Sequence, residues 1–132
     1  MSVNNKDDFL QHRIEQEQKH FAVGKTDDPL SSILTVEINT TELCNRTCVF
    51  CPRHDPKVYP NRNLHMSVKG ATMIAEQLQD MVFRGKVSLS GFGENLLNPN
   101  FKRIVSTFKQ RLPRATVECN TNGDRLTKEV VE

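Results

Sequence analysis

Apolar residues recur along the chain with two different periods. From residue 33 to residue 41 apolar and polar side chains alternate, so that Leu34, Val36 and Ile38 share one face of an extended segment. This alternation predicts strands at residues 33–41, 86–90 and 115–120. Elsewhere apolar residues recur three and four positions apart, which predicts helices at residues 8–22, 67–84, 98–112 and 124–132. The predicted order is one helix followed by three strand–helix units.

Residues at the predicted helix ends agree with this assignment. Ser67 is the predicted N-cap of the second helix, and Gly85 is its predicted stop. Asn98 and Pro99 are predicted to open the third helix. The buried stripes that we expect are Val68, Ala71, Ile74, Ala75, Leu78, Met81 and Val82 in the second helix, and Phe101, Ile104, Val105, Phe108 and Leu112 in the third.

The alternation of strands and helices predicts an α/β fold with a parallel sheet and right-handed crossovers. Strands of a fully covered parallel sheet are usually apolar on both faces, but each predicted strand here has one polar face. The polar positions are Glu37, Asn39, Ser88, Ser90, Glu118 and Asn120. They fit either a sheet face open to solvent or a barrel wall that lines a polar active-site lumen. The lumen is favoured because motifs follow the carboxyl ends of the strands, where ligands of α/β folds bind.

Composition narrows the class of protein without fixing a partner. The chain has 132 residues, which suits one domain, and a hydrophobic fraction of 36%, which allows a core of modest size. The net charge of +2 argues neither for nor against a nucleic-acid or membrane partner. The sequence shows no targeting segment and no bilayer-spanning apolar stretch, so we expect a cytoplasmic protein. Thiols stay reduced there, and the four cysteines therefore indicate metal binding rather than disulfides.

Three of the cysteines, Cys44, Cys48 and Cys51, lie close together in the loop after the first strand. Thiolates at this spacing indicate one metal centre, and three of them leave one iron of a [4Fe–4S] cluster open to another ligand. A structural zinc site with His54 as the fourth ligand is an alternative, as are a disulfide and chance. Cys119 falls on the apolar face of the third strand, so we expect it in the core.

The spacing Cys-x3-Cys-x2-Cys after a first strand resembles the signature of the radical SAM superfamily, and Phe50 stands where that family usually has an aromatic residue. The resemblance implies that Cys44, Cys48 and Cys51 hold a [4Fe–4S] cluster. It also implies that the amine and carboxylate of S-adenosylmethionine (SAM) chelate the open iron, while Phe50 packs near the adenine. By the same resemblance, the reduced cluster cleaves SAM to methionine and a 5′-deoxyadenosyl radical, which abstracts a substrate hydrogen.

A second motif, Ser90–Leu97, follows the second strand and resembles the family's Gly-Gly-Glu motif. It departs from that pattern, because Phe92 stands at the first glycine position and Asn95 replaces a common proline. The resemblance implies SAM binding by Gly91, Phe92, Gly93 and Glu94, largely through backbone carbonyls that contact the amino group. A branched side chain at Gly93 is then expected to weaken SAM binding, since glycine lets the backbone approach a ligand closely. The alternative is an ordinary glycine-rich turn.

A third motif, Asn120-Thr121-Asn122-Gly123, resembles the Thr-Asn-Gly turn of the same family. Asn120 is expected to point toward the lumen and to reach the SAM ribose or the substrate. For Thr121 and Asn122 the alternative is a simple turn, because Asn and Gly tolerate left-handed backbone geometry.

The three motifs occur in the family's order between residues 33 and 123, and the family fold is a partial TIM-type barrel of six βα units. The chain supplies about half of these units. We therefore expect residues 1–32 to be an N-terminal helical extension and residues 33–132 to be the N-terminal half of an incomplete core, in a fragment or a natural truncation. Such a chain alone is not expected to be a competent enzyme. The stretch 91–99 resembles members with a C-terminal SPASM-type extension.

The resemblance also implies partners. They are a reductant such as flavodoxin or ferredoxin and a substrate that is a peptide, a sugar or another small molecule, with no membrane and no clear nucleic-acid partner. No side chain is assigned a catalytic role. A small zinc- or iron–sulfur-binding module without catalysis is the alternative function. Arg46 and Arg53 are expected at the surface, with charge compensation of the cluster as the alternative.

Overall fold

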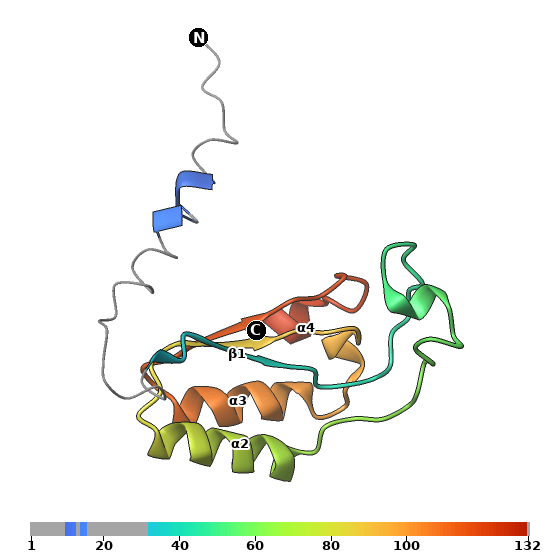
Figure 1. Ribbon diagram of the computed structural model, residues 1–132. Helices are drawn as coiled ribbons and strands as arrows, with labels where there is room; N and C mark the ends of the chain where they lie inside the picture. Colours follow the sequence, from blue (N-terminus) through green and yellow to red (C-terminus); the bar gives the residue numbers. More distant parts are fainter. Residues whose placement is uncertain (1–9, 13, 16–31, 132) are drawn as a thin grey trace.

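A computed structural model describes residues 10–12, 14–15 and 32–131 of the chain (Figure 1). Residues 10–12 and 14–15 are helical, and the other residues of the helix predicted at 8–22 lie outside the described part of the chain. Among the described residues, no helix is both long enough and apolar enough to cross a membrane.

Within the described residues the sheet has three strands, each four residues long, in the order β1-β2-β3. They are β1 (Thr35–Ile38), β2 (Lys86–Leu89) and β3 (Thr116–Cys119). Both neighbouring pairs are parallel, and the register places Ile38 beside Leu89 and Leu89 beside Cys119. The predicted strands and the parallel sheet are confirmed, although each strand is shorter than its predicted range.

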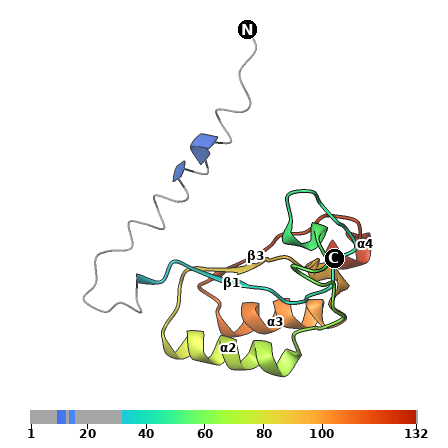
Figure 2. The same cartoon turned by 45° about the vertical axis from the view of Figure 1, so that its right-hand side comes forward.

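Two helices cover one face of this sheet. They are α2 (Val68–Asp80) and α3 (Phe101–Arg111), which lie side by side against the sheet (Figure 1, Figure 2). The buried apolar core lies between these layers and consists of Ile38, Ala71, Ala75, Leu78, Phe83, Val87, Leu89, Ile104, Phe108 and Leu112. Burial of one large apolar side chain contributes about 1.5–3 kcal/mol, so Leu89, Ile104 and Phe108 contribute strongly to stability.

The end of α2 differs from the prediction. Ser67 caps the helix as predicted, since its hydroxyl accepts a 3.1 Å hydrogen bond from the backbone N–H of Gly70. The helix, however, ends at Asp80, and Val82 adopts a φ of 54° and is 64% exposed instead of joining the buried stripe. Gly85 therefore does not end the helix. It permits a close approach, because a Cβ there would lie 2.2 Å from the carbonyl oxygen of Leu34.

The turn that ends α2 is a Schellman motif built without glycine. The backbone N–H of Phe83 donates to the carbonyl of Leu78 at 3.0 Å, and that of Val82 donates to the carbonyl of Gln79 at 2.9 Å. Phe83 and Leu78 both join the core. Burial of this pair explains why the helix ends here, at a position where the sequence offers no glycine.

The beginnings of the later helices also differ. Asn98 and Pro99 do not open α3, which begins at Phe101 after the short 3₁₀ helix η3 (Asn95–Leu97). Asn98 instead turns into the core, 3% exposed, where its amide donates to the carbonyls of Thr40 and Met66 at 2.8 and 3.1 Å. The last helix, α4 (Lys128–Val131), begins four residues later than predicted.

The polar strand positions form a row on the face opposite the helices. Glu37, Ser88 and Glu118 are register partners across the three strands. Ser88 is 5% exposed, while the two glutamates at the sheet edges are exposed. Lys86 forms a 3.6 Å ion pair with Glu118 on this face. The three loops that follow the strands meet at the carboxyl edge of the sheet.

Candidate functional site

The side chain of Asn95 ties the carboxyl ends of all three strands together. Its Oδ1 accepts a 2.6 Å hydrogen bond from the hydroxyl of Thr40, which follows β1. Its Nδ2 donates to the carbonyls of Leu89 and Asn120, at 2.7 and 2.9 Å, in β2 and just after β3. Asn95 is 1% exposed, and buried polar groups are costly when unpaired, so this amide fixes the spacing of the three loops.

The first of these loops contains the three predicted cysteine ligands. Asn61 closes it with two hydrogen bonds, since its Oδ1 accepts from the N–H of Cys44 and its Nδ2 donates to the carbonyl of Cys44, both at 2.9 Å. The N–H of Cys51 donates to the carbonyl of Cys48 at 3.0 Å. All three cysteines are free and partly exposed.

The structure shows no ready-made metal site in this loop. Across the described residues, no group of three or more Cys, His, Asp or Glu side chains is arranged to bind a metal ion. The same finding applies to His54, which lies exposed in the 3₁₀ helix η2 (Pro52–His54). The structure thus brings Cys44, Cys48 and Cys51 into one loop, and neither a cluster geometry nor a zinc geometry is preformed.

Arg53 follows the last of these cysteines and is buried, with 4% of its surface exposed, so the prediction that it lies at the surface is wrong. Its Nε donates to the carbonyl of Phe92, and its Nη1 donates to Oδ1 of Asn61 at 3.0 Å. The guanidinium lies over the ring of Tyr59, with Cζ 4.7 Å from the ring centroid. This arginine therefore joins the cysteine loop to the glycine-rich loop after β2.

The glycines of the second motif pack against the protein itself. A Cβ on Gly93 would lie 1.8 Å from the carbonyl oxygen of Thr41. Gly91 has a φ of 139°, and a Cβ there would lie 2.8 Å from the side chain of Asn39. Close approach to the loop after β1 is therefore sufficient to require both glycines.

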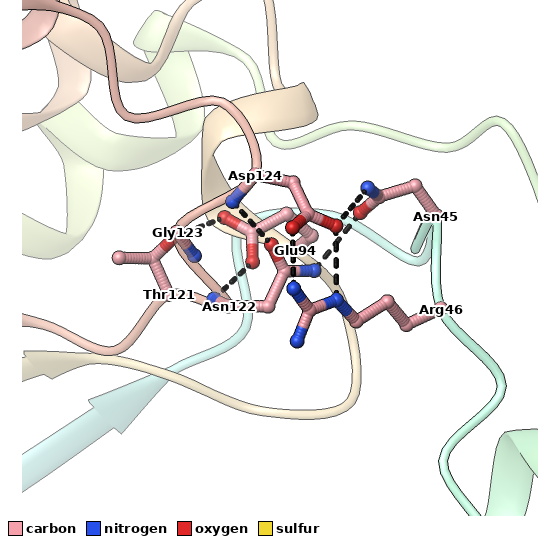
Figure 3. A network of polar contacts seen from close by, with 7 residues as sticks. All are labelled: Asn45, Arg46, Glu94, Thr121, Asn122, Gly123 and Asp124. Atoms are coloured by element: carbon pink, nitrogen blue, oxygen red, sulfur yellow. Dashed lines mark hydrogen bonds and ion pairs between the residues drawn. The ribbon is translucent and has the colours of Figure 1, made fainter.

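The carboxylate of Glu94 joins the second motif to the third (Figure 3). Oε1 accepts hydrogen bonds from the hydroxyl of Thr121 at 2.7 Å and from the N–H of Leu96 at 3.1 Å. Oε2 accepts from the N–H of Asn122 at 2.7 Å. Glu94 is 3% exposed, and its carboxylate is engaged by the protein on both oxygens. Thr121 and Asn122 thus have a structural role in the turn.

A polar network joins the third motif to the cysteine loop (Figure 3). Arg46 forms an ion pair with Asp124, Asn45 donates to the same carboxylate at 2.8 Å, and Asn122 donates to Oδ1 of Asn45 at 2.9 Å. The hydrogen bond from Arg46 lowers the pKa of Asp124, and the same bond raises the pKa of Arg46. Both views of the fold show the two loops side by side (Figure 1, Figure 2). The surface position expected for Arg46 is confirmed by its 47% exposed side chain.

The fourth cysteine lies apart from this loop. Cys119 packs against the core from the end of β3, as predicted, but remains partly exposed. Burial, together with the charge of Glu94, raises the pKa of its thiol to about 11. Cys119 is therefore a protonated structural thiol near neutral pH.

Comparison with known proteins decides the family. The profile described as "Radical SAM superfamily" matches residues 38–132. The chain belongs to the radical SAM superfamily. This confirms the family predicted from the cysteine spacing.

Individual relatives of this superfamily agree with the fold. The S-adenosyl-L-methionine-dependent 2-deoxy-scyllo-inosamine dehydrogenase of Niallia circulans is 36% identical over 101 residues, which cover 76% of this chain and 39% of the relative. The crystal structure of BtrN in complex with AdoMet and 2-DOIA has a TM-score of 0.67 at 31% identity, over 74% of this chain and 39% of that chain. A SeMet BtrN structure in an open conformation has a TM-score of 0.64 at 29% identity, over 80% and 45%.

These similarities confirm the predicted α/β fold with a parallel sheet, and they are consistent with a partial barrel. The chain spans about two-fifths of the length of the radical SAM relative that it matches.

The donor chemistry of the site fits the iron–sulfur cluster typical of the superfamily. Three free thiols share one loop, and iron–sulfur clusters are held by cysteine thiolates. In the same loop, Nη2 of Arg53 is buried and has no hydrogen-bond partner among the described residues. A buried guanidinium with an unused donor suits an anionic group, such as a cluster held by thiolates.

Several residues of this candidate site were not predicted from the sequence. Asn61, Asn95 and the buried state of Arg53 depend on partners far along the chain. The sequence does contain one signal for two of them, because Arg53 and Asn61 stand next to turn-forming prolines inside the cysteine loop. That feature marks a tight loop without naming the partners.

Proposed function

We propose that the protein containing this chain is a radical SAM enzyme that holds a [4Fe–4S] cluster on Cys44, Cys48 and Cys51. When bound, the cluster and SAM supply the reductive cleavage of SAM to methionine and a 5′-deoxyadenosyl radical for hydrogen abstraction from a substrate. One observation carries the proposal: three free cysteines share the loop after β1 in a chain that belongs to the radical SAM superfamily.

The exposed groups around this loop support SAM binding at the same edge of the sheet. Phe50 is 88% exposed, so its ring is free to pack against the adenine of SAM. Phe92 is 47% exposed, and the segment from Gly91 to Glu94 would contact the amino group through its backbone. Asn120 is exposed at the end of β3, where its side chain would reach the ribose or the substrate.

For the substrate we propose a small, sugar-like molecule rather than a peptide. The relative from Niallia circulans is named a 2-deoxy-scyllo-inosamine dehydrogenase, which supports a small polar substrate. The row of Glu37, Ser88 and Glu118 on the face opposite the helices would offer hydrogen bonds to hydroxyl or amino groups. A cytoplasmic flavodoxin or ferredoxin would supply the electron.

Metal analysis tests the proposal. Anaerobic reconstitution with iron and sulfide should give about four irons per chain and broad visible absorption. Changing Cys44, Cys48 or Cys51 to Ala should abolish both, because each iron in such a cluster that SAM does not ligate needs a thiolate. Cys119→Ala is the matched control and should retain the cluster, since Cys119 lies at the end of β3.

The alternative function predicts a different metal. A zinc-binding module would give one zinc per chain, no iron uptake and a colourless protein, with His54 as the candidate fourth ligand. Stoichiometric zinc that His54→Ala removes would establish this alternative and exclude the radical SAM chemistry proposed here.

A further inference from the structure

Arg53 is a buried cation without an acidic partner. It is 4% exposed, and none of the ion pairs among the described residues includes it. One of its nitrogens, Nη2, is buried without a hydrogen-bond partner within the described part of the chain. A buried charge is unfavourable unless it is compensated, and among the described residues no acidic side chain forms an ion pair with this one.

Three contacts fix the direction of this guanidinium. Nε donates to the carbonyl of Phe92, and Nη1 donates to Oδ1 of Asn61 at 3.0 Å. Tyr59 covers one face of the group, and the Tyr59 ring in turn meets Phe92 edge-on, with centroids 5.2 Å apart and planes at 66°. These contacts hold the guanidinium, and with it Nη2, in one orientation.

The cysteine loop contains Arg53 together with its partners Tyr59 and Asn61. Arg53 lies in η2, directly after Cys51, whose carbonyl accepts from the N–H of His54 at 2.9 Å. Asn61, which holds Nη1, also bonds both the N–H and the carbonyl of Cys44 at 2.9 Å. The guanidinium thus shares a hydrogen-bond partner with the first cysteine and is two residues from the third.

We propose that Arg53 is a positioning residue that supplies a fixed, buried positive charge to the anionic centre held by the three cysteines. This inference rests on the proposed function, because the anion is the cluster with its thiolates. Each electron added to the cluster makes the centre more negative, and a nearby buried cation stabilises the reduced state more than the oxidised state. Arg53 therefore raises the reduction potential. Arg46 is not equivalent, because it is exposed and already paired with Asp124.

The test compares the cluster's redox equilibrium in charge variants of the protein, reconstituted anaerobically and titrated without SAM. Arg53→Gln removes the charge, and Arg53→Lys keeps the charge but loses the planar guanidinium with its several N–H donors. Arg62→Gln removes an exposed charge in the same loop and is the matched control. We expect Arg53→Gln to lower the ratio of reduced to oxidised cluster, at a fixed applied potential, by about tenfold, which is 59 mV for a one-electron couple. Arg53→Lys and Arg62→Gln should stay close to wild type.

Each possible outcome either supports or overturns the inference. An Arg53→Gln protein that is loaded and has the wild-type ratio overturns the inference, as does a shift that appears only after SAM is added. If Arg53→Gln takes up no cluster, Arg53→Lys decides: a loaded lysine variant with the wild-type potential supports the inference, and an unloaded or shifted one overturns it. Wild-type protein that binds zinc and no iron overturns the proposed function itself, which distinguishes the two failures.

Discussion

Thr40 and Asn95 lie 55 positions apart in the sequence and share a 2.6 Å hydrogen bond between fully buried side chains. The bond joins the loop after β1 to the loop after β2. Through its amide nitrogen, Asn95 continues to the carbonyls of Leu89 and Asn120. One side chain therefore spans the carboxyl edge of the sheet, directly beneath the loops that carry the cysteines and the glycine-rich motif.

We predict that Asn95→Ala lowers the free energy of unfolding by about 2–4 kcal/mol, because it leaves the buried hydroxyl of Thr40 without its acceptor and removes one hydrogen bond from each of the carbonyls of Leu89 and Asn120. Urea denaturation measures the change. Asn100→Ala is the control, since the Asn100 side chain makes no capping hydrogen bond, and its effect should be about 0.5 kcal/mol or less. Equal losses in the two variants would contradict the spanning role.

Gly93 gives a second prediction, which concerns how the glycine-rich motif is tested. A Cβ on Gly93 would meet the Thr41 carbonyl oxygen at 1.8 Å, so Gly93→Ala should cost about 3 kcal/mol in unfolding free energy. Gly123 has a φ of 82° and no atom within 4 Å of its Cβ position, so Gly123→Ala should cost about 1–2 kcal/mol of backbone strain alone. Thermal denaturation distinguishes the two.

This comparison changes how the result for a variant with a branched side chain at Gly93 is interpreted. A loss of SAM binding in Gly93→Val would follow from the clash with Thr41, whether or not the backbone touches SAM. A stable, fully folded Gly93→Ala protein would show that the loop can move away from Thr41, which would contradict this explanation.

A third prediction concerns the strained end of α2. Val82 is β-branched, adopts a φ of 54° and is 64% exposed, so its left-handed conformation is strained while its side chain packs little. Val82→Gly should therefore raise the free energy of unfolding by about 0.5–1 kcal/mol, after the entropic cost of glycine. Met73→Gly, at a half-exposed position inside α2, should lower it by about 1 kcal/mol. A destabilised Val82→Gly protein would disprove the strain.

The elements of the fold were predictable because their patterns are local. Alternation over residues 35–38 and the apolar stripe of α3 each lie within one segment, and both are confirmed. The end of α2 was not predictable, because it depends on the burial of Phe83 against Leu78. Gly85, three residues after Val82, would be the more usual helix stop. It is required instead by its close contact with the carbonyl of Leu34.

The same distinction applies to the site. Cys44, Cys48 and Cys51 were predicted as ligands from their spacing within one loop, and the superfamily that this spacing resembles is confirmed, while the ligand role stays a prediction. The buried state of Arg53 was missed, because its acceptor on Phe92 lies 39 positions away and a surface position is usual for arginine. Side chains that join separate loops leave no periodic pattern in a sequence.

The last prediction concerns the exposed ion pair between Arg46 and Asp124, which links the cysteine loop to the loop after β3 (Figure 3). Exposed pairs add little to global stability, so its effect should be local. In Asp124→Asn we expect the backbone amides of Asn45 and Arg46 to exchange hydrogen several-fold faster, with little change in unfolding. Glu118→Gln breaks an exposed pair with Lys86 away from this loop and should leave those amides unchanged.

The contribution of the Arg46–Asp124 pair depends on pH in a definite direction. The hydrogen bond from Arg46 lowers the pKa of Asp124 below its ordinary value of 3.8 in the folded state. The contribution of the pair is therefore fully present above that ordinary value and is lost as the pH falls through the folded pKa. At neutral pH wild type and Asp124→Asn should differ in exchange at Asn45 and Arg46, and the difference should vanish in strong acid while the sheet amides stay protected. A difference that persists after Asp124 is protonated would assign the ordering of the cysteine loop to hydrogen bonds of the neutral carboxyl group, such as the one from Asn45, instead of to the ion pair.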